Sequence, residues 1–244
     1  MARLSNFAPL SLPFLAGSIV LLFFVVLSGI TSSPPFHQTY FLSADTTNIT
    51  GARPVSQWTY FRICGEDNSN CSAAWPDPPI GWAWSKDPTG PNLPTKLIGA
   101  YGDGTTSYVY FYLWRFGWVL YLLALFATIL AFFIGFAAVI NRVRAYIAAL
   151  VSAISLLLLT FAASLMTATF VRMRDQFIAA GREAHIGVYA FGFTWAAWVL
   201  ALASFVLLFL LARTRVVTRM RRNQSVRSRP SHDVGGHRIK EEYA

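Results

Sequence analysis

The chain is organised around the stretch Gln57-Trp58-Thr59-Tyr60-Phe61-Arg62-Ile63-Cys64-Gly65, which leads on to Asn70-Cys71-Ser72-Ala73-Ala74-Trp75-Pro76-Asp77-Pro78-Pro79. Aromatic and β-branched residues before Cys64 favour a strand, and the polar residues between the two cysteines are typical of a tight turn. Two cysteines on either side of a short turn can reach the Cα separation of about 5.5–6 Å that a disulfide needs. We predict that Cys64 and Cys71 are bonded to each other; two free thiols are the alternative.

Four long apolar runs dominate the composition of the 244-residue chain, in which 55% of the residues are hydrophobic. They cover residues 8–30, 116–140, 145–170 and 188–211, and none contains Asp, Glu, Lys, Arg or His. Each has the roughly 20 residues that a helix needs to cross a bilayer core. The sequence therefore predicts an all-α membrane bundle of four transmembrane helices, with spans at 8–30, 114–140, 145–170 and 188–211.

The basic residues indicate the orientation of this bundle. If both termini are cytoplasmic, the cytoplasmic segments 1–7, 141–144 and 212–244 carry twelve basic and three acidic residues, and eight of each cancel on the opposite side. This is the positive-inside pattern. It places residues 31–113 and 171–187 in an oxidising compartment, which supports the disulfide. It also makes Asn48, in the sequon Asn48-Ile49-Thr50, a candidate glycosylation site.

The first apolar run could instead be a cleaved signal peptide, because Val26-Leu27-Ser28-Gly29 resembles a small-residue cleavage site. However, the run is longer than an h-region of about 7–15 residues, and only one basic residue precedes it. These features favour an uncleaved span.

Residues 31–113 are too long and too aromatic for a simple connection, so we expect a small extracellular β-sheet there, pinned by the disulfide. The candidate strands are residues 37–43, 56–64 and 107–112. Trp82 and Trp84 are candidates for the lipid headgroup level or for contact with a sugar face.

Small residues recur at four-residue spacing in the third apolar run, at Ala145, Ala149 and Ala153, and such rows let helices approach closely. Only four residues, 141–144, join the second and third runs, which predicts an antiparallel hairpin. Alanine is also simply common in membrane helices, so the row alone does not prove an interface.

Seven arginines lie between residues 213 and 229. A basic run next to a membrane attracts anionic lipids by about 1 kcal/mol per residue, and we assign this role to Arg213, Arg215, Arg219, Arg221 and Arg222. The simpler alternative is that the run acts only as a topology signal. Ser225 follows Arg221-Arg222 and is a candidate phosphorylation site that would weaken lipid attachment.

The chemistry of enzymes and transporters is missing from the pattern. The apolar runs hold no ionisable group of the kind that carries ions or protons, the four histidines are scattered, and no nucleophile motif is present. We therefore expect no catalytic residues, no cofactor and no metal site. Nucleic acid is not an expected partner of an arginine run tethered to a membrane.

Taken together, these features resemble the fungal SUR-seven/PalI family of claudin-like tetraspan proteins. The resemblance covers residues 8–211 and is most specific at Trp58, Cys64, Gly65 and Cys71 and in the Ala-Ala-Trp-Pro-Asp-Pro-Pro segment with Pro76 and Pro78. It implies a plasma-membrane protein of fungal cortical domains (eisosomes), with roles in membrane organisation, endocytosis and cell-wall integrity.

The leading hypothesis is a non-enzymatic organiser that makes lateral contacts with lipids and membrane proteins, or with further copies of itself. The alternatives are an accessory subunit of a large membrane enzyme, such as a cell-wall synthase or proton pump, and a PalI-like pH-signalling scaffold.

Overall fold

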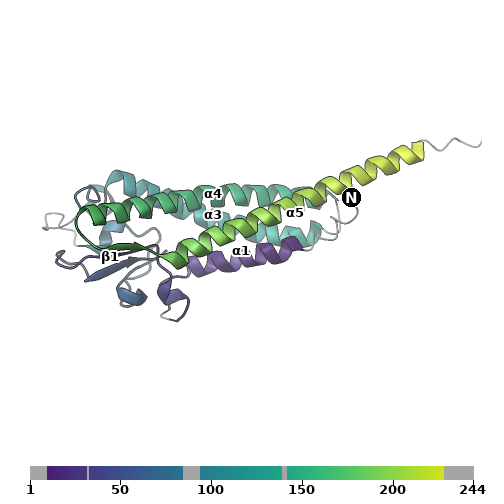
Figure 1. Ribbon diagram of the computed structural model, residues 1–244. Coiled ribbons are helices and arrows are strands. Elements are labelled where there is room, and N and C mark those ends of the chain that lie inside the picture. Colours follow the sequence, from purple (N-terminus) through teal and green to yellow (C-terminus); the bar gives the residue numbers. More distant parts are fainter. Residues whose placement is uncertain (1–9, 32, 85–93, 139–141, 228–244) are drawn as a thin grey trace, which may run out of the picture.

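Four helices form a bundle that carries a small antiparallel sheet at one end (Figure 1). The computed structural model describes residues 10–31, 33–84, 94–138 and 142–227, and for residues 142 and 214–227 it describes the backbone alone. The bundle helices are α1 (Ser11–Val26), α3 (Tyr108–Ala138), α4 (Arg142–Ala179) and α5 (Val188–Arg227). The N-terminal end of α1 lies far from the sheet, at the end of the bundle where α5 extends beyond the other helices (Figure 1).

Three of the described helices are long and apolar enough to cross a membrane, over Tyr108–Ala138, Val143–Ala179 and Val188–Arg213. The fourth, α1, is a shorter apolar helix of 16 residues. The protein is thus mostly helical, with three candidate membrane helices, a small sheet and a disulfide, which is consistent with a claudin-like membrane protein.

Buried hydroxyl groups link the helices in an otherwise apolar interior. Ser18 on α1 donates to the Ala197 carbonyl on α5 at 3.0 Å, and Thr128 on α3 bonds Ser155 on α4 at 2.6 Å. Such bonds hold apolar helices together where the hydrophobic effect is absent. In the predicted small-residue row, Ala145 and Ala149 are buried and Ala153 is half-buried.

The sheet has four short strands in the order β3-β2-β1-β4, and every neighbouring pair is antiparallel. Its strands are β1 (Leu42–Asp45), β2 (Val55–Trp58), β3 (Ile63–Cys64) and β4 (Ala184–Ile186). The last strand comes from the connection between α4 and α5, so both loops at this end of the bundle build one sheet.

Two of the three predicted strands have other bounds in the structure, and the third predicted strand is a helix. Residues 36–38 form a 3-10 turn, so the first strand begins only at Leu42. The strand expected at 56–64 is two strands, because Thr59 closes a turn by donating its N–H and hydroxyl to the Arg62 carbonyl. Residues 108–112 belong to α3, since the aromatic run continues directly into an apolar helix.

Aromatic side chains fasten the sheet to the ends of the helices. Phe41, just before β1, is fully buried, and its ring stacks on Phe170 of α4 at 5.0 Å between centroids. The Tyr60 hydroxyl donates to the Trp118 carbonyl on α3 at 2.6 Å, and Trp58 packs on Phe177 of α4. The sheet domain, meaning the described residues between α1 and α3 together with β4, therefore shares one core with the bundle.

Candidate functional site

The disulfide turn forms one wall of the candidate site. A disulfide joins Cys64 to Cys71, as predicted. Within the turn, Asn68 donates its backbone N–H to the Gln57 side chain at 2.9 Å and its amide to the carbonyls of Phe36 and Thr39. These bonds fix the turn against β2 and against the segment before β1.

The sheet has one face toward the helices and one face away from them. Leu42 and Ala44 of β1 are buried, whereas Ser43 and Asp45 alternate with them and point to the other side. The register aligns Ser43 with Gln57 on β2 and with His185 on β4. A row of polar side chains therefore crosses the outward face.

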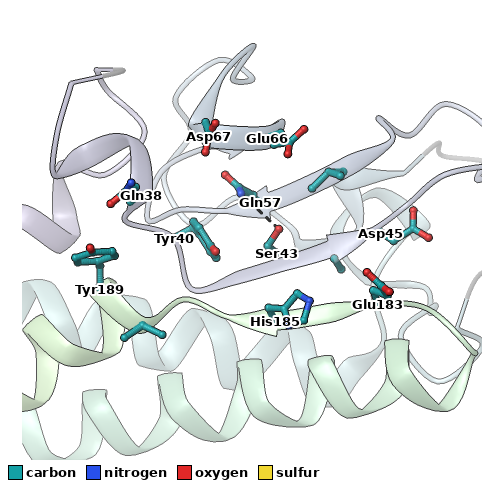
Figure 2. Close-up of a pocket in the computed structure, with 13 residues that line it drawn as sticks. Gln38, Tyr40, Ser43, Asp45, Gln57, Glu66, Asp67, Glu183, His185 and Tyr189 are labelled. Atoms are coloured by element: carbon teal, nitrogen blue, oxygen red, sulfur yellow. Dashed lines mark hydrogen bonds between the residues drawn. The ribbon is translucent and has the colours of Figure 1, made fainter.

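A groove of about 600 Å³ lies over this row, and we call it the sheet groove (Figure 2). Figure 2 shows Gln57, Ser43 and His185 along its floor, with Asp67 and Glu66 of the disulfide turn above them. The aromatic rings of Tyr40 and Tyr189 lie toward one end, and Asp45 and Glu183 lie toward the other. The site thus combines residues from the disulfide turn, three strands and the start of α5.

Acidic groups dominate the sheet groove, since its lining holds four carboxylates and neither Lys nor Arg. The hydrogen bonds that Asp45 accepts from the Thr47 side chain and backbone N–H keep the pKa of this carboxyl below its usual value. Burial raises the pKa of Tyr40, and the charge on Asp67 adds to that shift. The groove thus holds four carboxyl groups, with the charged form of Asp45 and the neutral form of Tyr40 favoured by their surroundings.

Arg182 does not line the sheet groove, but it stabilises the acidic end of the groove. Its guanidinium donates to the backbone carbonyls of Asp45 and Thr47 at 3.1 and 2.9 Å and lies 4.0 Å from the Asp45 carboxylate. It thereby ties the end of α4 to the end of β1.

The lining offers hydrogen-bond acceptors, negative charge and ring faces. In the part of the chain that the structure describes, no group of three or more His, Cys, Asp or Glu side chains is placed to hold a metal ion. The arrangement suits the binding of a polar partner.

None of the four motif residues lines the groove, and two of them, Trp58 and Pro78, make hydrogen bonds that hold the sheet domain in place. The Trp58 indole N–H donates to the Ile80 carbonyl at 3.0 Å, and the Pro78 carbonyl accepts from Trp114 at 3.0 Å. Gly65 is buried beside the disulfide, and Pro76 is exposed.

Asn48 is exposed in the connection between β1 and β2, with a positive φ of 61°. Because the residue is exposed, the structure is compatible with the predicted modification.

Trp84 is neither at the surface nor available to a sugar, which corrects the sequence-based expectation. It is 3% exposed and packs on Phe177, because the segment containing it folds down onto α4. Trp82 is half-buried, and its indole N–H donates to Asp103 at 3.2 Å.

The arginine run continues α5, whose backbone is helical to Arg227. Arg213 lies over the Phe209 ring, 5.3 Å from its centroid. The side chains of Arg215, Arg219, Arg221, Arg222 and Ser225 lie outside the described residues, so their predicted roles remain predictions.

Sequence reasoning did not identify the groove residues Tyr40, Gln57, His185 and Tyr189 as a group. A weak signal existed for β4, since Ala184-His185-Ile186 alternates before Gly187. Only the pairing of β4 with β1 gives that alternation a meaning.

Comparison with known proteins places the fold among fungal membrane proteins. Residues 7–207 match the model of the SUR7/PalI family. The chain is 32% identical to Protein SUR7 of Candida albicans over 91% of this chain and 82% of that protein. It is 30% identical to SUR7 family protein FMP45 of Saccharomyces cerevisiae over 78% of this chain and 61% of that protein. An uncharacterized plasma membrane protein of the same yeast is 28% identical over 76% and 62% of the two chains.

Proposed function

This chain belongs to the SUR7/PalI family, and from that premise we propose that it is a non-enzymatic organiser of cortical domains of the eisosome type in a fungal plasma membrane. In this proposal it supports membrane organisation, endocytosis and cell-wall integrity through lateral contacts with lipids and proteins. The name of a plasma membrane protein among its relatives supports the location.

The proposed topology has four spans, with α1 as the first. Ser11 and Ser18 of α1 contact Ser204 and Ala197 of α5 in reverse order, so the two helices are antiparallel neighbours. At 1.5 Å per residue, the 16 residues of α1 rise about 24 Å, somewhat less than a bilayer core of about 30 Å. In the sequence, the apolar run that contains α1 covers residues 8–30.

Both termini are cytoplasmic in this proposal, which puts the sheet groove outside the cell. The N-terminal end of α1 and the long extension of α5 lie at the end of the bundle opposite the sheet (Figure 1). The arginines after Leu211 would then meet the anionic lipids of the cytoplasmic leaflet. Asn48 would face the compartment in which N-glycans are added.

The observation that carries the proposal is the shared core of sheet domain and bundle. Phe41, Tyr60 and Trp58 join the sheet to α3 and α4, so the sheet groove is held in a fixed orientation to the membrane. Residues 116–138, 145–171 and 188–212 contain no Asp, Glu, Lys, Arg or His, whereas transport pathways usually use such groups. A binding surface held rigidly on an apolar bundle is consistent with a protein that organises its neighbours in the membrane.

The test is the composition of the complex that the tagged chain forms at native expression in a fungal cell, extracted in mild detergent. An organiser should yield assemblies of several copies with lipid. A fixed ratio to one large enzyme would instead make the chain an accessory subunit, and a lone monomer would contradict lateral assembly.

Fluorescence imaging adds a second readout with a matched pair of variants. Cys64→Ser should reduce the fraction of protein in surface patches, because the turn that walls the sheet groove loses its cross-link. Ser69→Ala, an exposed change in the same turn, should leave that fraction unchanged. Normal patches in the Cys64 variant would count against the proposal.

A further inference from the structure

An apolar groove lies between α3 and α4 toward the end of the bundle that carries the sheet. We call it the helix groove. It has a volume of about 440 Å³ and is lined mainly by Tyr108, Tyr112, Phe116, Leu120, Leu165 and Arg172. Its lining is almost wholly apolar apart from one cation. The cation is Arg172, and its presence beside an apolar lining needs an explanation.

The groove forms beside a close contact between the two helices. Beside it, Gly117 of α3 faces α4 so tightly that an added Cβ would lie 3.2 Å from the Met166 sulfur and 3.4 Å from Leu165 Cβ. Large side chains on either side of this contact, such as Phe116 and Leu165, then leave a hollow between the helices.

Arg172 marks the polar end of the groove. Its backbone carbonyl accepts a hydrogen bond from the Tyr110 hydroxyl at 3.4 Å, which puts it level with the first turn of α3. Leu120 lies ten residues further along α3, or about 15 Å. That is half of a bilayer core of about 30 Å, the depth of one leaflet.

The Arg172 guanidinium takes part in none of the ion pairs among the described residues. Arg174 pairs with Asp175 at 2.7 Å, Arg115 pairs with Asp77, and Arg182 lies beside Asp45. Arg172 is exposed and borders an apolar surface, so an anion held there would gain charge complementarity without displacing a carboxylate.

We propose that the helix groove binds one phospholipid of the leaflet on the sheet side, with its phosphate on Arg172 and an acyl chain along Phe116, Leu120 and Leu165. Guanidinium is well suited to phosphate because its N–H groups match the phosphate oxygens in pairs. Tyr108 and Tyr112 lie at the polar end, where amphipathic rings favour the headgroup level. The inference needs only that α3 and α4 lie in a bilayer, so it is independent of the proposed cortical role.

Photo-crosslinking in vesicles tests this site. The full chain is reconstituted in phosphatidylcholine with a small fraction of phosphatidylglycerol that carries a diazirine on one acyl chain, and labelled peptides are mapped by mass spectrometry. Wild-type protein should be labelled within residues 108–120 and 165–172. Diacylglycerol with the same diazirine chain but no phosphate should label these peptides about fivefold less.

Two variants on the same helix turn separate the charge of Arg172 from general lipid exposure. Arg172→Gln should reduce the labelling about fivefold, the equivalent of one basic contact at a lipid surface. Arg174→Gln should not reduce it, because Arg174 is paired with Asp175 and does not line the groove. Both variants keep the arginine run after Leu211, so lipid bound there is a constant background.

Equal labelling of the two variants would overturn the proposal, as would equal labelling by the phosphate-free probe, which needs no variant to fold. Wild-type peptides left unlabelled, together with a crosslink between two copies in this region, would show that a second chain fills the groove, and that result would also overturn the proposal.

Discussion

Phe41→Ala should weaken the attachment of the sheet domain to the bundle. The side chain is 0% exposed, and its ring lies 5.0 Å from Phe170, 5.6 Å from Phe191 and 6.1 Å from Trp114, measured between centroids. It therefore contacts α3, α4 and α5 at once. The substitution leaves the backbone bonds of Phe41 to Trp58 and Gly187 in place.

The magnitude follows from cavity formation. Truncation of a buried Phe to Ala costs about 3–5 kcal/mol, a large share of a total stability of about 5–15 kcal/mol. For a chain of this size, each kcal/mol lowers the melting temperature by about 2–4 °C, so we expect a drop of about 6–20 °C. Phe41→Leu should cost about 1–1.5 kcal/mol, since it keeps most of the volume.

The assay is thermal unfolding of the full chain in one mild detergent, followed by the fraction that stays monodisperse. Phe161→Ala is the matched control. Phe161 lies on α4 in the same bundle, but it is 60% exposed and would contact detergent in this assay. The control should shift the free energy of unfolding by less than about 0.5 kcal/mol. A Phe41→Ala shift no larger than that of the control would refute the shared core.

Four further outcomes are expected. Gly187→Ala should cost more than about 2 kcal/mol in the same melting assay, because its Cβ would overlap the Tyr40 carbonyl. Cys64→Ser should cost about 2.5 kcal/mol, the loop-closure value for so short a loop. Burial raises the pKa of Asp77 against the opposing effect of Arg115, so the native state keeps this proton at a pH where the unfolded chain has lost it. The Asp77 contribution to stability is therefore greatest below the unfolded pKa of 3.8 and falls as the pH rises through the folded pKa, and Asp77→Asn should abolish that dependence in melts at several pH values. Asn48→Gln should remove the mass that an N-glycosidase releases from the chain made in a fungal cell.

Each of these has a result that contradicts it. Gly187→Ala should be far worse than Gly192→Ala, since an added Cβ at Gly192 meets nothing within 4 Å; equal melting temperatures would exclude the close approach. An unchanged melting temperature for Cys64→Ser would mean that the cross-link does not constrain the unfolded chain. A pH profile that persists in Asp77→Asn would assign the titration to another carboxyl. A wild-type mass insensitive to the glycosidase would show that Asn48 is unmodified.

The helices and the disulfide could be predicted because their signals are local. A membrane helix is a continuous apolar run, and the bond between Cys64 and Cys71 closes over a turn whose composition is visible in the sequence. The same locality explains the error at residues 108–112, where strand-forming aromatic residues begin a helix that the following apolar residues extend.

The groove residues could not be predicted because their proximity depends on pairing over long distances. His185 reaches Ser43 only through the register of β4 on β1, and β4 has three residues. Arg172 likewise belongs to the helix groove only because α3 and α4 are antiparallel at Gly117. Neither relationship leaves a periodic pattern in the sequence.

The late position of β4 in the chain has a consequence for biosynthesis. The ribosome delivers β1, β2 and β3 long before β4, so the edge of β1 that pairs with β4 stays open while α3 and α4 are being synthesised. An open edge is a template for wrong pairing with other chains. In the proposed topology, β4 reaches β1 only after α4 has crossed the membrane, so completion of the sheet depends on correct insertion of α4.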